Sequence, residues 1–164
     1  MYKISMVSLG CPKNQVDAEM MLAALKKVGF EIGVPEAEAD AIIINTCGFI
    51  EDAKKEAIEN ILEAAEYKKT GKCKALIVTG CLAERYKNDV TEEIPEVDVC
   101  VGIGADGDIA KIVTDALKGS KENVFADKYE LNLNSDRILG GYPFSTYLKI
   151  GDGCDNCCTY CAIP

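Results

Sequence analysis

The chain has 164 residues, of which 18 are Lys or Arg, 27 are Asp or Glu and none is His, giving a formal net charge of −9. The lack of His excludes Ser-His and Cys-His catalytic pairs, His-ligated zinc and imidazole acid–base chemistry within this chain. The negative charge argues against direct, non-specific binding of nucleic acid, which depends on Lys and Arg neutralising phosphates. No stretch approaches the roughly 18 apolar residues needed to cross a bilayer. We therefore expect a cytoplasmic globular protein with no membrane attachment.

Apolar, β-branched runs alternate with helix-like segments along residues 1–118. The strand-like runs are 2–8, 30–33, 41–45, 75–79 and 97–101, and the helix-like runs are 13–28, 49–68, 82–94 and 107–118. This alternation predicts an α/β fold, in which an open, mostly parallel sheet of the flavodoxin or Rossmann kind has helices on both faces. Within the runs 41–45 and 75–79, Ile42–Ile44 and Leu76–Val78 are continuously apolar, which indicates central strands covered on both sides. We predict one five-stranded parallel domain over residues 1–118.

The pattern changes after this domain. Residues 119–145 are polar and have no helical period, so we predict a loosely packed linker. Residues 147–150, YLKI, favour a new strand that leads into the sequence GDGCDNCCTYC. We interpret residues 146–164 as the first strand and loop of a second domain that is truncated at Pro164.

Nine cysteines in a chain without secretory features favour metal binding or redox chemistry over disulfides. Three of them share one position: Cys11, Cys47 and Cys81 each follow a predicted strand, and each lies next to a Gly. The carboxyl ends of parallel strands meet at one edge of a sheet, so we expect the three thiols to line one concave site. Thiolates suit zinc or iron–sulfur clusters, and three ligands without a fourth favour a 4Fe–4S cluster with one open iron. With a cluster bound, the sulfurs should lie on the order of 6–7 Å apart.

The simpler interpretation is that these cysteines are small buried residues. It explains a single such position more easily than three matching ones. Cys73 and Cys100 lack the strand-end position. We expect Cys73 at the surface and Cys100 in the core, both away from the predicted site.

A second set of cysteines stands near the end of the chain. Cys154, Cys158 and Cys161 form a C-x3-C-x2-C motif, with the aromatic Tyr160 before the last cysteine. Three closely spaced cysteines on one loop can ligate three corners of a cluster. The segment resembles the motif of radical S-adenosylmethionine (SAM) enzymes. Cys157 departs from the usual motif, and it is open as a competing ligand or a disulfide partner.

The blocks SLGCPKNQVDAE, NTCGFI, TGCLAERY and CDNCCTYCAIP together resemble the methylthiotransferase family of radical-SAM enzymes, across essentially the whole chain. SLGCPKN resembles the ribosomal-protein (RimO) type, whereas the tRNA type usually shows GCQMN. The resemblance implies two 4Fe–4S clusters. An auxiliary cluster would be held by Cys11, Cys47 and Cys81, and a SAM-binding cluster by the C-x3-C-x2-C motif, with Tyr160 near the SAM adenine.

The resemblance also implies an activity for the full-length protein. This is the transfer of a methylthio group to the β-carbon of an aspartate in a small-subunit ribosomal protein, with an electron donor that reduces the clusters. A tRNA-adenosine methylthiotransferase of the same family is the nearest alternative. This stretch alone lacks the barrel that completes the SAM site, so we expect it to be inactive. No catalytic residue is separable from the cluster ligands.

Two weaker features support rival interpretations. Gly102, Gly104 and Gly107 formally match a dinucleotide fingerprint, but they follow the last predicted strand, and a glycine turn opening a helix explains them more simply. The 49–68 helix has an acidic face made of Asp52, Glu56, Glu59, Glu63 and Glu66. A solvated face is expected there, and docking of a basic protein is the functional alternative. A nucleotide-binding flavodoxin-like module and a plain metal-binding or redox module remain as rival functions.

Overall fold

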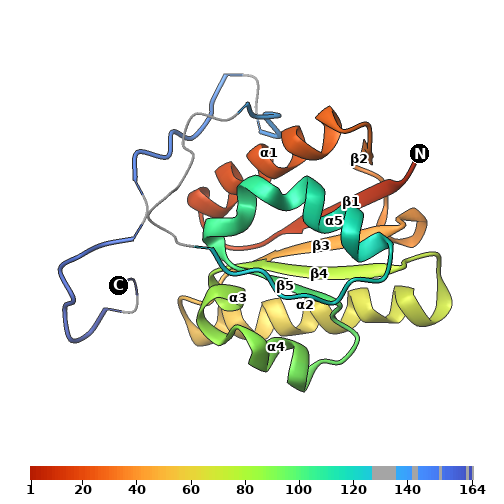
Figure 1. The fold of residues 1–164 in the computed structure, drawn as a ribbon. Helices are drawn as coiled ribbons and strands as arrows, with labels where there is room; N and C mark the ends of the chain where they lie inside the picture. Colours follow the sequence, from red (N-terminus) through yellow and green to blue (C-terminus); the bar gives the residue numbers. More distant parts are fainter. Residues whose placement is uncertain (127–135, 142–143, 152, 162, 164) are drawn as a thin grey trace.

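Five parallel strands form the centre of the molecule (Figure 1). The computed structural model describes residues 1–126, 136–141, 144–151, 153–161 and 163. The strands are β1 (Lys3–Ser8), β2 (Glu31–Ile32), β3 (Ala41–Thr46), β4 (Ala75–Gly80) and β5 (Val99–Val101). The helices are α1 (Pro12–Lys27), α2 (Glu51–Thr70), α3 (Cys81–Tyr86), α4 (Asn88–Glu93) and α5 (Ile109–Leu117), with 3-10 turns η1 (Glu36–Glu38) and η2 (Ile103–Asp108).

The strand order is β2-β1-β3-β4-β5 and every pairing is parallel. The predicted five-stranded parallel α/β sheet is therefore confirmed, and β3 and β4 are central strands as expected. From β1 the chain crosses to β2 on one side, and from β3 it continues to β4 and β5 on the other. The order thus reverses between β1 and β3, which is where open α/β sheets form their ligand crevices.

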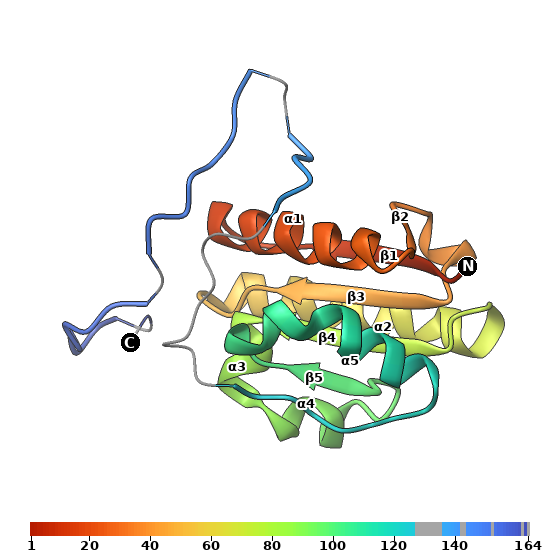
Figure 2. The same cartoon turned by 45° about the horizontal axis from the view of Figure 1, so that its top comes forward.

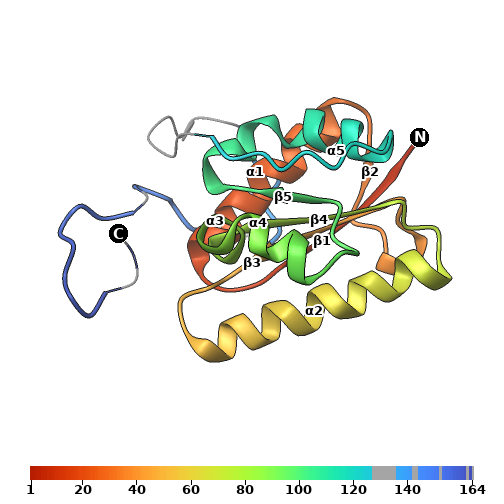
Figure 3. The same ribbon diagram turned by 60° about the horizontal axis from the view of Figure 1, so that its bottom comes forward.

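Helices cover both faces of the sheet (Figure 3). Helices α1 and α5 pack on the face that carries Ile43 and Ile77, and α2, α3 and α4 pack on the face that carries Ile44 and Val78. These four strand side chains are 0% exposed, and burying each contributes about 2 kcal/mol of hydrophobic stabilisation. Two covered faces explain why the strands are continuously apolar instead of alternating.

The predicted helix over 82–94 is two short helices instead of one. The chain breaks at Lys87, whose φ of 46° lies in the left-handed region. After the break, α4 places Val90 in the same core cluster as Leu82 and Ala83 of α3. Tertiary packing therefore overrides a sequence that has no Gly or Pro to mark the turn.

Two expectations for the last third of the chain differ from the structure. Residues 147–150 form no strand; they are part of a stretch that runs away from the sheet (Figure 1), and a strand needs a neighbour to pair with. The predicted linker is anchored at its start, because Val124 pairs in parallel with Val101. Its residues 127–135 lie outside the described residues. Within the described chain, no helix is long and apolar enough to span a membrane.

Candidate metal centre

The three strand-end cysteines lie on neighbouring loops at the carboxyl edge of the sheet. Cys11 follows β1 and is the N-cap residue of α1, Cys47 follows β3, and Cys81 is the first residue of α3, directly after β4. Strands β1, β3 and β4 are adjacent in the sheet. Cys11 and Cys47 therefore flank the point where the strand order reverses, and Cys81 is one strand further along.

Two glycines bring these loops into contact. At Gly10, whose φ is +97°, a Cβ atom would lie 2.5 Å from the Cβ and 3.1 Å from the Sγ of Cys47. At Gly48, a Cβ atom would lie 3.2 Å from the Cα of Leu82, the residue after Cys81. A larger residue at Gly10 would push the first two loops apart, and the Cys47 loop touches both of the others.

A buried pair of asparagines ties the Cys11 loop to the end of β3. The Asn14 amide donates to the backbone oxygen of Thr46 at 2.8 Å, and the Asn45 amide donates to the backbone oxygen of Asn14 at 2.8 Å. The thiol of Cys11 donates to the Asn14 side-chain oxygen at 3.2 Å. Neither asparagine was predicted from the sequence to belong to the site. A signal was present for Asn45, because its polar amide directly follows the apolar run Ile42–Ile44.

The three thiols are brought to one edge but do not form a preassembled site. Cys47 is 7% exposed, whereas Cys11 and Cys81 are exposed. Within the described residues, no three His, Cys, Asp or Glu side chains lie close enough together to hold a metal ion. The donor set suits an iron–sulfur cluster, and binding one requires the thiols to turn toward each other, as occurs when metal binding orders its own ligands. The guanidinium of Arg85 donates to the Gly48 oxygen at 3.1 Å and so holds the Cys47 loop from the α3 side.

The two remaining cysteines of the sheet domain lie away from this edge. Cys73 precedes β4, at the opposite end of that strand, and Cys100 lies inside β5. The expected surface position of Cys73 is wrong: it is 6% exposed, its thiol donates to the Ala75 oxygen at 3.4 Å, and it packs in the core cluster beneath α2. Burial raises the pKa of the Cys73 thiol. Cys100 is 0% exposed as predicted, and burial raises its pKa to about 12.

The C-terminal cysteine loop, residues 153–161, is much more open. Cys154, Cys157 and Cys158 are exposed and Cys161 is partly buried. Tyr160 is 90% exposed. A single turn is closed by the Cys161 N–H, which donates to the Cys158 oxygen at 2.9 Å. All nine cysteines lie among the described residues and none forms a disulfide. Cluster ligation by this loop and contact of Tyr160 with SAM stay predictions.

The glycine motif after β5 does not form a phosphate cradle. The Gly102 N–H donates to the Val124 oxygen at 2.8 Å, and the Ile103 N–H donates to the Glu84 carboxylate at 3.1 Å. A Cβ atom on Gly102 would lie 2.4 Å from that carboxylate. A phosphate needs free N–H groups and no facing negative charge. The arrangement therefore favours a glycine turn over a dinucleotide site.

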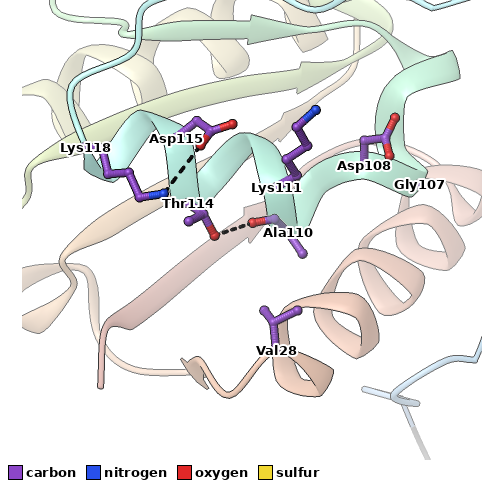
Figure 4. Close-up of a pocket in the computed structure, with 8 residues that line it drawn as sticks. All are labelled: Val28, Gly107, Asp108, Ala110, Lys111, Thr114, Asp115 and Lys118. Carbon is purple, nitrogen blue, oxygen red and sulfur yellow. Dashed lines mark hydrogen bonds and ion pairs between the residues drawn. The ribbon is translucent and has the colours of Figure 1, made fainter.

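Two other surface features contain none of the predicted ligands. A hollow of about 470 Å³ lies between Val28 and the outer side of α5 (Figure 4). Two interactions within α5 use polar side chains of this hollow: Lys118 lies 3.7 Å from Asp115, and the Thr114 hydroxyl donates to the Ala110 oxygen at 2.7 Å. The five acidic side chains predicted on the outer face of α2 are all exposed, as expected for a solvated face.

Comparison with known proteins extends these observations. The family described as "Uncharacterized protein family UPF0004" matches residues 3–102. Curated relatives named "Ribosomal protein uS12 methylthiotransferase RimO" are similar along essentially the whole chain. Those of Desulforamulus reducens, Acetivibrio thermocellus and Syntrophotalea carbinolica are 51%, 50% and 48% identical, over 100%, 99% and 99% of this chain. The chain spans just over a third of these relatives, at 37%, 37% and 36% of their lengths. The family expected from the sequence blocks is thus confirmed.

Proposed function

We propose, on the premise that this chain belongs to the UPF0004 family, that it supplies the auxiliary cluster domain of a methylthiotransferase acting on a ribosomal protein. The substrate would be the β-carbon of an aspartate in uS12, the protein that the names of the curated relatives give. The whole protein would carry out this reaction in the cytoplasm with an electron donor. Similarity to those relatives along the entire chain supports the proposal.

The observation that carries the proposal is the meeting of three cysteine loops at one sheet edge. Cys11, Cys47 and Cys81 come from three adjacent strands, and glycine contacts and the Asn14–Asn45 pair hold their loops together. Three chance cysteines would not be expected to share one edge of the sheet with two of them flanking the point where the strand order reverses.

The proposed ligand sets follow from the two cysteine groups. The auxiliary 4Fe–4S cluster would be held by Cys11, Cys47 and Cys81, and the SAM-binding 4Fe–4S cluster by Cys154, Cys158 and Cys161, with Tyr160 beside the SAM adenine. When bound, these groups would supply the radical and sulfur-donating chemistry that side chains cannot provide. The chain itself provides thiolates, keeps Cys47 away from bulk water and fixes the loop spacing through Gly10 and Asn14.

The test of function compares uS12 from cells with and without the full-length gene. Mass spectrometry should find one methylthio group on an aspartate of uS12 only when the gene is present. Unmodified uS12 together with a gene-dependent methylthio group on tRNA adenosine would identify the tRNA type of the family instead. If deletion of the gene changed the modification of neither uS12 nor tRNA, both assignments would be rejected.

The test of the ligand set uses anaerobically reconstituted full-length protein. Replacing Cys11, Cys47 or Cys81 by Ala should lower bound iron by about half, because one of two clusters is lost. Cys73→Ala is the matched control, since it removes a thiol of the same domain from the opposite end of β4. Unchanged iron in the three variants, or an equal loss in the control, would contradict this ligand set.

A further inference from the structure

Residues 136–141 and 144–150, here called the strap, are fastened to helix α1. The Ile138 N–H donates to the Glu19 backbone oxygen at 3.1 Å, and the Gly140 N–H donates to the Glu19 carboxylate at 3.2 Å. The Arg137 guanidinium donates twice to the same carboxylate, from Nε at 3.1 Å and from Nη2 at 2.5 Å. Figure 2 shows residues 136–141 beside α1. The Glu19 carboxylate therefore binds two residues of the strap, Arg137 and Gly140, and the Glu19 backbone oxygen binds Ile138 between them.

A second ion pair fastens the end of the strap. Lys149 Nζ lies 2.7 Å from Asp17 of α1, and the two side chains are 3% and 16% exposed. Arg137 also donates to the Tyr147 oxygen at 2.9 Å, which joins the two halves of the strap. Asp17 and Glu19 thus bind opposite halves of the same segment.

These contacts are buried, which separates them from ordinary surface ion pairs. The side chains of Glu19 and Arg137 are 5% and 20% exposed, whereas those of the nearby pair Lys27–Asp136 are 67% and 72% exposed. Burial alone would raise the pKa of Glu19, but the bonds from Arg137, Gln15 and the Gly140 N–H outweigh it and hold that pKa below its ordinary value. Buried pairs gain little net stability because desolvation offsets their attraction, and their best-attested use is to fix one register.

The position of the strap along α1 matters because a cysteine precedes the helix and a cysteine loop follows the strap. Helix α1 begins at Pro12, directly after Cys11, so Asp17 and Glu19 stand within about two turns of that cysteine. The strap continues toward residues 153–161. In Figures 1 and 3 this cysteine loop lies on the side of the molecule toward which the strands run.

We propose that Asp17 and Glu19 are positioning residues that seat the strap on α1 and so hold the C-terminal cysteine loop on the side where the strand-end cysteines lie. The attachment of the strap to α1, here called the seating, is inferred from the contacts alone. Its role in aligning two clusters rests on the proposed function.

Hydrogen exchange of this chain, read by NMR at single amides, tests the seating. Glu19→Ala should speed exchange at Ile138 and Gly140 by about tenfold or more, because it breaks a buried pair and removes an acceptor. Exchange in β3 and β4 reports whether the variant remains folded. Lys27→Ala is the matched control, since it removes an exposed α1–strap pair, and it should change the same amides by less than about twofold.

Variants on the strap side keep the test decisive if Glu19→Ala does not fold. Arg137→Ala and Lys149→Met leave α1 intact and should each speed exchange across the strap. In a double-mutant cycle, the double variant Glu19→Ala with Arg137→Ala should speed exchange by less than the product of the two single increases. The reason is that both substitutions break the same contact. The seating would be overturned if the strap amides exchanged at the same rate in both strap variants as in the unchanged chain. It would also be overturned if the rate increases of the two single variants simply multiplied in the double variant.

The alignment is tested in the reconstituted full-length protein. Arg137→Ala should leave bound iron unchanged while lowering uS12 modification by tenfold or more, since ligands are intact and only their placement changes. Unchanged modification would overturn the alignment. Absence of iron in the unaltered protein would reject the proposed function, and the exchange result for the seating would stand.

Discussion

The two cysteine sets are held in very different ways. Cys11, Cys47 and Cys81 sit on loops that leave adjacent strands of a closed core, so the sheet itself fixes where they are. The C-terminal cysteines sit on one exposed loop with a single internal turn, reached through a strap whose buried ion pairs are with α1. The placement of the thiols therefore depends on core packing in the first set and on charge pairing in the second. Changes to the core should affect the first set, and changes to the strap the second.

The sharpest contrast between buried and exposed thiols should appear in chemical labelling. A pKa of about 12 lowers the thiolate fraction of Cys100 on the order of a thousandfold at neutral pH relative to an unperturbed thiol. We expect iodoacetamide to label Cys154 and Cys158 within minutes in the folded, metal-free chain, and Cys100 only after unfolding. Peptide mass spectrometry checks this. Rapid labelling of Cys100 in the folded state would contradict its place in the core.

Glycine replacements should separate the two regions by stability. At Gly80, whose φ is +92°, a Cβ atom would lie 2.4 Å from the Thr46 oxygen, so Gly80→Ala should cost about 3 kcal/mol of unfolding free energy. Gly153 also has a positive φ, +67°, but no atom lies within 4 Å of its Cβ position. Gly153→Ala is the control, and it should leave global unfolding in urea within about 0.5 kcal/mol. Equal losses for both would show that the C-terminal loop is part of the core.

A matched pair of asparagines gives a smaller effect. Asn14 accepts from the Cys11 thiol at 3.2 Å and is 4% exposed, whereas Asn156 donates to Cys154 Sγ at 3.5 Å and is exposed. Asn14→Ala leaves buried partners unpaired and should cost about 2 kcal/mol in urea unfolding. Asn156→Ala should cost less than about 0.5 kcal/mol. The reverse order would contradict the role of Asn14 in tying the first two loops together.

The smallest expected effect is the pH dependence of hydrogen exchange in the strap. Because the folded-state pKa of Glu19 is lowered, its ionised form stabilises the strap contact fully above its unfolded value, about 4.3. That contribution is lost as the pH falls through the lowered folded value. Exchange at Gly140, corrected for its intrinsic pH dependence, should therefore stay slow from pH 7 to 5 and rise only below about 4.3. A rise centred near pH 6 would contradict pairing with a carboxylate.

The core of the fold was predictable because its signal is local. Ile42–Ile44 and Leu76–Val78 are continuous apolar runs, and a strand of a parallel sheet that is covered on both faces is the structure that requires them. The cysteine edge followed from a rule of topology, since parallel strands end on the same side. The meeting of the Cys11, Cys47 and Cys81 loops needed no knowledge of their side-chain contacts.

The features that sequence did not reveal depend on distant partners. Glu19 and Arg137 are 118 positions apart, and neither has a local pattern that points to the other. Cys73 stands between Lys72 and Lys74, so its neighbours suggest a surface position while its own side chain points into the core. The helix break at Lys87 and the absence of a strand at 147–150 likewise depend on what packs beside the segment.

The outer edge of β5 is covered by another part of the chain. The Val124 N–H donates to the Cys100 oxygen at 3.0 Å, and the Gly102 N–H donates to the Val124 oxygen, so the returning chain occupies backbone groups that an edge strand would otherwise present to other molecules. Unpaired edge strands act as templates for aggregation. Residues 120–126 therefore act as a cover for the sheet, and a chain shortened to end at Gly119 should self-associate more readily because β5 would then offer its free edge to a second copy.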